Sequence, residues 1–436
     1  MSSALIYHDE KPDDEFVQER FGELMDITNE ALVKLAVSVR SKYSTTATTT
    51  PTAWVLQHWL GTYNLIHIVE FSDGLKYVIR VPASARHGQM TETARRALTA
   101  QAHMMRFVKK STRIPMPDVL DFNTGFANPL KAPYIVMAHI PGRMVAEAWF
   151  DRSGPVPLEE KRLRILDSVA EAMAQLRGFQ FEQIGSIEEE GGSGSGEEKE
   201  KEKEKGNKPG QSVFQIEQFG PFTSSAAYLR NRLQRTSQWQ DDIGDRGSRV
   251  LLDLMIECLP LSTKRRTEPR ESFVLSIPDL SAKNVLIDDH GAVTGFVDWD
   301  DAHTMPRFLG YTCFPHWITP NLNMLRMGLP KDKDHEDPPE LLMQYRRRYN
   351  RKMQALLRGV GDARFVNKSH IYSAVHFAIC HQSSRLEIVC WLVARAFPTT
   401  LPAAMKMVLS AGQGKLSTSD KDQLTIGFQA LFSIYH

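Results

Sequence analysis

Three short runs of β-branched and aromatic residues near the start of the chain restrict its fold more than any other feature. The runs are Trp54–Leu60, Asn64–Phe71 and Lys76–Val81. Such runs are typical of strands with a buried face. The segment between the last two contains Asp73 and Gly74, a pair that signals a hairpin. We therefore expect antiparallel strands in this part of the chain.

Helical patterns stand on both sides of these strands. A pattern over Asp14–Tyr43 leads into a Thr-rich loop, and Glu92–Lys110 places apolar residues at helical spacing. Two further strand candidates lie near Val119–Phe122 and Tyr134–Ala138. Together these segments predict a small antiparallel sheet that carries one helix.

From Pro157 onward the periodicity is mostly helical, and the exception is a short hairpin between Val285 and Val297. The sequence therefore predicts a bilobal molecule of the α+β class, with a small antiparallel-sheet N-lobe and a mostly helical C-lobe. The predicted domains are an N-terminal helical extension with the Thr-rich loop (1–50), the N-lobe (51–139) and the C-lobe (140–436).

One stretch of the C-lobe has a composition unlike the rest. Glu188–Lys208 contains eight Glu, five Lys and no apolar residue. Such a segment cannot bury enough surface to offset the entropy that is lost on ordering. We expect a disordered insertion over residues 187–212, with a transient solvated helix as the alternative.

The overall composition argues against several partners. The 436 residues carry 53 Lys and Arg against 52 Asp and Glu, and this balance gives no electrostatic case for a nucleic acid or an anionic membrane. No apolar run reaches the roughly 18 residues of a membrane span. The first residues lack a secretory signal, so we expect a cytoplasmic protein. The four cysteines form no C-x-x-C pair, and buried reduced thiols are expected.

The segment Phe273–Ala302 carries the side chains best suited to chemistry. A short apolar strand leads to Asp279, and Asn284 follows five positions later. A predicted hairpin then returns the chain to Asp298. Because a hairpin brings its two ends together, we expect Asn284 and Asp298 side by side with Asp279 near them.

Three converging oxygen-bearing side chains suit a hard cation that is held on a polyphosphate. Mg²⁺ prefers oxygen ligands and is commonly shared between one or two carboxylates and substrate phosphates. A remaining carboxylate can accept the proton of an attacking hydroxyl. This division of roles indicates phosphoryl transfer.

The D-x-x-x-x-N motif, the hairpin and the final D-W resemble the catalytic segment of the aminoglycoside phosphotransferase-like kinases, relatives of the protein kinases. The likeness is nearest to the poorly characterised set of such proteins in fungi. It extends over about Trp54–Phe397, apart from the charged insertion. Further motifs in the same order are G-T-Y-N (Gly61–Asn64), I-P-M-P-D-V (Ile114–Val119), Y-I-V-M (Tyr134–Met137), I-P-G-R (Ile140–Arg143), P-R-F-L-G-Y (Pro306–Tyr311) and S-R-L-E-I-V (Ser384–Val389).

The resemblance implies a protein-kinase-like fold that uses ATP and Mg²⁺. It makes Asp279 the catalytic base and assigns Asn284 and Asp298 as Mg²⁺ ligands. Arg80 takes the position of the Lys that reaches the nucleotide phosphates. The remaining implied contacts are a turn over the phosphates (Gly61, Tyr63, Asn64) and backbone groups that face the adenine (Met137, Ala138, His139).

Four positions depart from the pattern of the family. Ile277 replaces the usual His two residues before the base, and Arg80 replaces Lys. Gln101 stands where a Glu normally pairs with the phosphate-binding cation, so the helix supplies an amide that can hydrogen-bond Arg80 but no charge. Ala138 stands where an acidic hinge residue is more usual.

Plainer roles exist for several of these residues. Asp279 could simply begin a turn, and Arg80 could be an ordinary surface ion-pair partner. Asp300 and Asp301 could form an acidic rim, cap a helix or pair with Arg307. The histidines in apolar surroundings, His58, His67, His139 and His316, are expected to be core or surface residues.

The function expected from this resemblance is an ATP- and Mg²⁺-dependent transfer of a γ-phosphoryl group to a hydroxyl of an unidentified small molecule. The alternative is a catalytically degenerate nucleotide-binding or scaffold protein of the same fold, which Ile277 and Gln101 favour. A protein kinase is less favoured, because D-F-G and A-P-E motifs are absent from the sequence. The acceptor and the oligomeric state are not indicated.

Overall fold

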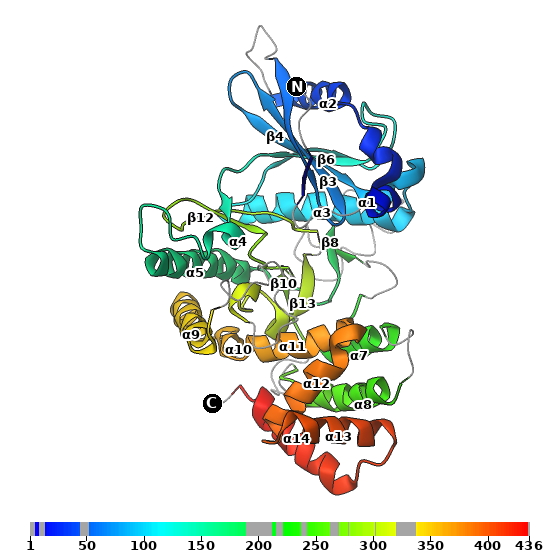
Figure 1. Ribbon diagram of the computed structural model, residues 1–436, viewed down its shortest axis with the longest axis vertical. Coiled ribbons are helices and arrows are strands. Elements are labelled where there is room, and N and C mark those ends of the chain that lie inside the picture. The colour runs from blue at the N-terminus through cyan, green and yellow to red at the C-terminus, as the bar shows by residue number, and fades with distance from the viewer. Residues whose placement is uncertain are drawn as a thin grey trace. The chain divides into compact units, whose positions relative to one another are not determined.

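The computed structural model describes residues 5–7, 14–43, 52–188, 212–214, 221–236, 242–261, 270–277, 279–300, 302–319 and 337–434. The chain forms two compact units (Figure 1). Unit 1 comprises Met1–Pro141, Glu188–Gly210 and Thr294–Asp300. Unit 2 comprises Gly142–Ile187, Gln211–Val293 and Asp301–His436.

Unit 1 is built on a six-stranded sheet with the order β1-β2-β3-β4-β6-β5. Strands β2 to β6 pair with one another in antiparallel orientation, as the sequence predicts. The sixth, β1, runs parallel to β2 and was not predicted. The bounds are β1 (Leu5–Tyr7), β2 (Ala53–Leu60), β3 (Asn64–Phe71), β4 (Lys76–Pro82), β5 (Val119–Asn123) and β6 (Tyr134–Ala138).

An apolar core joins this sheet to the N-terminal helices α1 (Asp14–Phe21) and α2 (Asn29–Tyr43). Alternate residues of β3, among them Leu65 and Val69, belong to the same buried cluster as Leu35 of α2. A fully buried aliphatic side chain stabilises the fold by about 1.5–3 kcal/mol, so a cluster of this kind fixes the register of β3 and β4.

Helix α3 (Glu92–Ser111) confirms the helix that was expected over Glu92–Lys110. It begins at the N-cap Thr91, whose side-chain oxygen accepts a hydrogen bond from the backbone N–H of Ala94 at 3.2 Å. Leu98, Gln101 and Met105 lie three and four residues apart and are all buried. The same helical face that packs the core therefore also carries Gln101.

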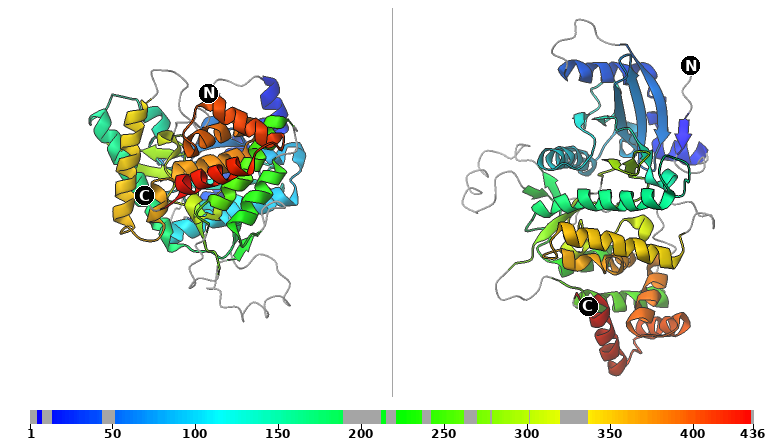
Figure 2. Two further views of the ribbon diagram at one scale, coloured as in Figure 1. Left: turned by 90° about the horizontal axis from the view of Figure 1, so that it is seen from below. Right: turned by 90° about the vertical axis from the view of Figure 1, so that its left-hand side faces the viewer.

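Unit 2 is mostly helical, which confirms the predicted α+β division. The pairs β10–β13 and β7–β11 are antiparallel, and Figure 2 shows α5 and α9 side by side. Its helices are α4 (Val145–Ala148), α5 (Leu158–Ala174), α7 (Ser225–Arg235), α8 (Ile243–Cys258), α9 (Pro339–Leu356), α10 (Ala363–Val366), α11 (Ser369–Cys380), α12 (Gln382–Ala396), α13 (Leu401–Gly412) and α14 (Thr418–Phe432). The remaining strands of the chain are β7 (Arg143–Met144), β8 (Ser186–Glu188), β9 (Ser212–Phe214), β10 (Phe273–Ser276), β11 (Val285–Ile287), β12 (Val293–Phe296) and β13 (His303–Pro306).

Two glycines allow helices α8 and α13 to approach closely. A Cβ atom on Gly247 would lie 1.9 Å from the carbonyl oxygen of Val408, and one on Gly412 would lie 2.0 Å from that of Ile243. Both distances are shorter than any real carbon–oxygen contact. A side chain at either position would therefore force the two helices apart.

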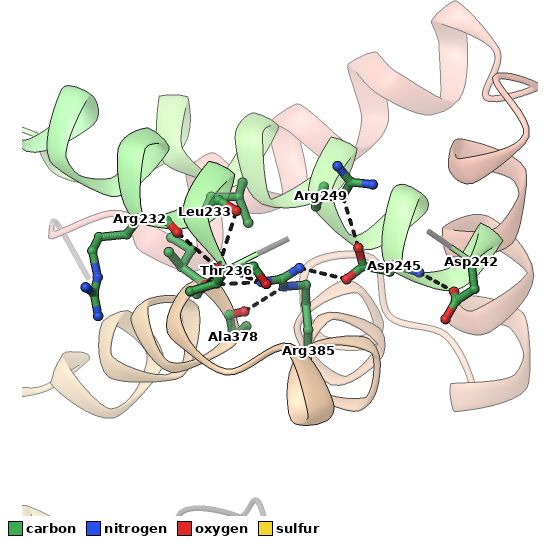
Figure 3. A network of polar contacts seen from close by, with 9 residues as sticks. Arg232, Leu233, Thr236, Asp242, Asp245, Arg249, Ala378 and Arg385 are labelled. Carbon is green, nitrogen blue, oxygen red and sulfur yellow. Dashed lines mark hydrogen bonds and ion pairs between the residues drawn. The ribbon is translucent and has the colours of Figure 1, made fainter. Parts of the chain in front are cut away.

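A buried ion-pair network ties four helices of unit 2 together (Figure 3). The guanidinium of Arg385 donates to Asp245 Oδ1 at 2.7 Å, to the hydroxyl of Thr236 at 2.8 Å and to the carbonyl of Ala378 at 3.0 Å. Arg249 pairs with the other oxygen of Asp245 at 3.1 Å. Burial lowers the pKa of Arg385 from its ordinary value, and Asp245 partly offsets this effect. The network therefore connects these helices of unit 2 through buried polar contacts.

The four cysteines are free thiols, but the expectation that all are buried is wrong. Cys390 is buried, whereas Cys258, Cys313 and Cys380 are only partly buried. The Cys380 sulfur lies 3.5 Å from Nε2 of His376. Although burial raises the pKa of Cys380, the charges of His376 and Arg232 outweigh burial and hold it at about 7. Cys380 therefore ionises more readily than the other three thiols, whose pKa values are raised by burial.

Residues 189–211 of the predicted insertion lie outside the described residues, and β8 pairs with β9 at its two ends. Among the described helices, none is long and apolar enough by itself to cross a membrane. Helices α12 and α13 meet the length and composition of a span only as a pair that is bent by 111°.

Candidate active site

The predicted site residues are divided between the two units. Unit 1 holds Arg80, Gln101, Asp298, the turn Gly61–Asn64 and the segment Met137–His139. Unit 2 holds Asp279 and Asn284. The expected approach of Asn284 to Asp298 therefore stays a prediction.

In unit 2, strand β10 leads to Asp279. All four residues of β10 are buried, and the strand pairs with β13. Asn284 Nδ2 donates to the carboxylate oxygen Oδ2 of Asp279 at 2.8 Å and to its backbone carbonyl at 3.1 Å. The loop between the two residues is closed further by a bond from the backbone N–H of Asn284 to the carbonyl of Ser281 at 3.1 Å. The acid and the amide of the D-x-x-x-x-N motif are thus held together.

His316 also contacts Asp279. Its Nδ1 lies 3.6 Å from Asp279 Oδ1, and its backbone N–H donates to the carbonyl of Leu280 at 3.0 Å. Burial by itself raises the pKa of Asp279, but the contact with His316 and the hydrogen bond from Asn284 outweigh burial and hold that pKa below its ordinary value. The carboxylate is therefore ionised at neutral pH. The expectation that His316 is an ordinary core or surface histidine missed this contact.

The two carboxylate oxygens of Asp279 have different surroundings. Oδ1 is buried and, among the described residues, receives no hydrogen bond. A buried acceptor without a donor is costly and calls for an explanation, of which a functional role is one. A ligand hydroxyl at this oxygen would satisfy it.

The orientation of Asn284 defines what it can offer to a cation. Because its amide nitrogen donates to Asp279, its amide oxygen is the atom that can coordinate a metal. An amide oxygen and a carboxylate such as Asp298 are the hard ligands that Mg²⁺ prefers. The donor set fits the expected ion.

In unit 1, the guanidinium of Arg80 faces two carboxylates. Arg80 lies on β4 opposite Ile66 and Ile135, and its side chain is only 8% exposed. It donates to Asp298 Oδ1 at 3.2 Å and forms an ion pair with Asp300. Burial by itself lowers the pKa of Arg80, but the charges of Asp300 and Asp298 outweigh it and raise that pKa. Arg80 is thus a buried, fully charged cation and not a surface residue.

Trp299 anchors the two carboxylates that face Arg80. The indole is 1% exposed, and its N–H donates to the carbonyl of Phe296 at 2.9 Å. Asp298 immediately before it has a φ of +62°, a left-handed conformation that is uncommon outside glycine. Such backbone strain persists only where the surroundings impose it, as they often do at functional sites.

Asp300 connects three elements of unit 1. Gln101 Nε2 on α3 donates to Asp300 Oδ1, and Asn64 Nδ2 on β3 donates to Asp300 Oδ2 at 3.3 Å. Arg80 on β4 binds the same Oδ2. Gln101 therefore donates to the carboxylate of Asp300. The hydrogen bond between Gln101 and Arg80 that the sequence suggested is not the one that forms.

The other roles considered for Asp300 are also corrected. Arg307 pairs with Asp362, at 2.6 Å from its Nε, and not with Asp300. Asp300 precedes the strand β13, so it caps no helix. Asp301 lies outside the described residues.

The turn Gly61–Asn64 joins β2 to β3. The backbone N–H of Gly61 donates to the carbonyl of Asn64 at 3.0 Å, and a Cβ on Gly61 would stand 3.0 Å from that same oxygen. Tyr63 at the tip is 67% exposed, and the guanidinium of Arg20 lies 5.3 Å from the centre of its ring. The assignment of this turn to the phosphates stays a prediction.

The segment Met137–His139 lies at the end of β6. The N–H of Ala138 donates to the carbonyl of Asp118 at 2.9 Å, and the N–H of His139 donates to that of Lys76 at 3.1 Å. These two backbone donors are already engaged within the sheet. The assignment of this segment to the adenine stays a prediction.

Comparison with protein families finds one model that matches more than half of the chain. Residues 54–309 match the model described as the phosphotransferase enzyme family, APH. The matched range includes the candidate residues described above in each of the two units.

Curated relatives are distant. A subtelomeric hrmA-associated cluster protein of Aspergillus fumigatus is 24% identical over 127 residues, which are 29% of this chain and 23% of the relative. Altered inheritance of mitochondria protein 9 of Eremothecium gossypii is 22% identical over 130 residues, which are 29% and 21% of the two chains. The match thus spans less than a quarter of either relative.

Solved structures are similar at low sequence identity. A thermostable mutant of aminoglycoside phosphotransferase APH(4)-Ia, in a ternary complex with AMP-PNP and hygromycin B, is 15% identical, with a TM-score of 0.41 over 81% of this chain and 92% of that one. Macrolide 2'-phosphotransferase MphH from Brachybacterium faecium is 12% identical, with a TM-score of 0.40 over 87% and 97%.

Proposed function

This chain belongs to the APH phosphotransferase enzyme family, and on that premise we propose that it transfers the γ-phosphoryl group of ATP to a hydroxyl of a small molecule with the aid of Mg²⁺. The observation that carries the proposal is the carboxylate of Asp279. It is held in the ionised form by its neighbours, and its buried Oδ1 accepts no hydrogen bond from the described residues. A general base must be ionised and within hydrogen-bond reach of the proton that it accepts.

The proposed roles follow from the contacts of each residue. Bound ATP and Mg²⁺ would supply the phosphoryl group and neutralise the charge that develops on it. Asp279 would accept the proton of the acceptor hydroxyl, whose oxygen then bonds to the γ-phosphorus as the bond to the ADP oxygen breaks. Asn284 and Asp298 would hold the cation through their side-chain oxygens, and Arg80 would bind phosphate oxygens. Catalysis would rest on positioning and charge.

Nucleotide binding and turnover test the function together. The melting temperature of the full chain is measured with ATP, with and without Mg²⁺, and ADP release is measured against a panel of hydroxyl compounds. We expect Mg²⁺ to lower the Kd for ATP and thereby to strengthen the stabilisation by ATP. A ligand at about 100 times its Kd adds roughly 2.7 kcal/mol to the free energy of unfolding. Asp298→Asn should remove the Mg²⁺-dependent part. ATP binding that ignores Mg²⁺, without turnover of any acceptor, would contradict the proposal and favour a scaffold role.

His316→Leu is expected to shift the pH profile of the reaction. Because the contact with His316 lowers the pKa of Asp279, its loss should raise that pKa. The base is then protonated at a higher pH, so the acid limb of kcat/KM should move to higher pH while the plateau above it is retained. His290→Leu, at an exposed turn, is the control. Equal profiles for the two variants would show that His316 does not tune the base.

A further inference from the structure

The buried cation Arg80 needs a counter-charge that persists when the proposed site is occupied. Its ion pairs among the described residues are with Asp298 and Asp300. If Asp298 holds a divalent cation, as proposed above, its negative charge is shared with that cation and its attraction for Arg80 falls. Asp300 then remains as the carboxylate in contact with Arg80.

Asp300 is held from three directions. Gln101 binds Oδ1, whereas Asn64 and Arg80 bind Oδ2. The side chain is 33% exposed, and the adjoining Trp299 is buried. A carboxylate that accepts hydrogen bonds on both oxygens has a defined orientation, so it can fix the guanidinium that it contacts.

The identity of residue 101 fits this arrangement. A Glu at 101 would place a second negative charge against Asp300, and like charges in a partly buried site repel strongly. Gln supplies an N–H donor in its place. The amide at 101 and the carboxylate at 300 are therefore complementary, and the negative charge that position 101 lacks is present on the segment after β12.

We propose that Asp300 is the positioning residue for Arg80 in the binding of nucleotide phosphates, and that Gln101 orients Asp300. The inference rests on the proposed function, because it assigns a partner to the phosphate-binding cation of that same site. Asp300 acts through Arg80 and touches no reacting atom. It thus fulfils, from a different element, the task of the acidic residue that is not present at position 101 of α3.

A charge exchange between positions 101 and 300 tests the inference. The dissociation constant of Mg²⁺·AMP-PNP is measured for the wild-type chain and for Asp300→Asn, Gln101→Glu and the double variant. Asp300→Asn should weaken binding about tenfold or more, because Arg80 loses its counter-charge. Gln101→Glu alone should also weaken it through repulsion. The double variant, which returns one carboxylate to the pair, should bind within about threefold of the wild type.

The sign of the coupling separates positioning from a general structural role. Gln101→Glu must be harmful in the wild-type chain and beneficial in the chain that already carries Asp300→Asn, an outcome that simple loss of packing does not produce. In turnover, the ATP KM should follow the same pattern while the acceptor KM stays constant. Asp73→Asn, which removes the carboxylate of another ion pair of unit 1, formed with Arg40 at 2.9 Å, is the matched control and should leave nucleotide binding unchanged.

Several results would overturn the inference. Equal or tighter binding by Asp300→Asn would show that Asp300 masks Arg80 instead of positioning it. Weaker binding by a double variant that folds, as judged by circular dichroism, than by Gln101→Glu alone would also overturn it, and this comparison decides the matter if Asp300→Asn alone does not fold. A wild-type chain that binds no nucleotide would refute the proposed function itself, and this result is distinct because it needs no variant.

Discussion

Asp279→Asn is expected to lower the turnover of the acceptor by about 10²- to 10⁴-fold, the usual contribution of a general base. The change removes the negative charge and the proton-accepting oxygen pair but keeps the size of the side chain. Because Asp279 is assigned no contact with the nucleotide, the dissociation constant of AMP-PNP should change little. Single-turnover phosphoryl transfer, measured beside nucleotide binding, separates the two effects.

A matched exposed residue controls for the charge change. Asp289→Asn, in the turn between β11 and β12, alters the net charge equally and should leave turnover unchanged. Wild-type turnover by Asp279→Asn would refute the assignment of the base. Loss of nucleotide binding in that variant would show instead that Asp279 serves the nucleotide or the fold.

Asp245→Leu is expected to destabilise the helical unit by about 3–5 kcal/mol, because it removes the carboxylate that pairs with the buried guanidinium of Arg385. The Arg385 and Asp245 side chains are 1% and 6% exposed, so water cannot take the place of the lost partner. Arg249 is 33% exposed and can turn toward solvent. The free energy of unfolding from urea denaturation measures the loss.

Two further variants test whether the loss of stability comes from the buried ion pair. Asp245→Leu combined with Arg385→Met removes both charges and should be less destabilising than Asp245→Leu alone. Asp253→Leu breaks the exposed pair with Arg230, whose atoms lie 2.6 Å apart, and should cost less than about 1 kcal/mol. A double variant that is as unstable as the sum of its single changes would show that the ion pair is not the source of the effect.

The sequence predicted the strands of the sheet well, because alternating apolar side chains and short turns act locally. Strand β3 coincides with the predicted Asn64–Phe71, and β4 extends one residue past the predicted Lys76–Val81. Strand β1 escaped prediction because it contains three residues and pairs with the distant β2. A run that short has no periodicity to detect.

Prediction of the site has the same limit, because contacts between residues close in sequence could be foreseen and contacts between distant residues could not. Asp279 and Asn284 are five residues apart, so their contact is a local property of one loop. The bond from Gln101 to Asp300 joins positions 199 residues apart, and only the folded sheet brings them together. The approach of His316 to Asp279 likewise depends on the packing of unit 2. The sequence could nominate the residue types but not their partners.

The buried indole of Trp299 fixes the positions of both flanking carboxylates together. Asp298 and Asp300 lie on either side of one side chain that is sealed in the core, and both contact the same guanidinium. Whatever dislodges that ring displaces both acids at once. A single substitution of this buried residue can therefore have the same effect as the loss of both carboxylates.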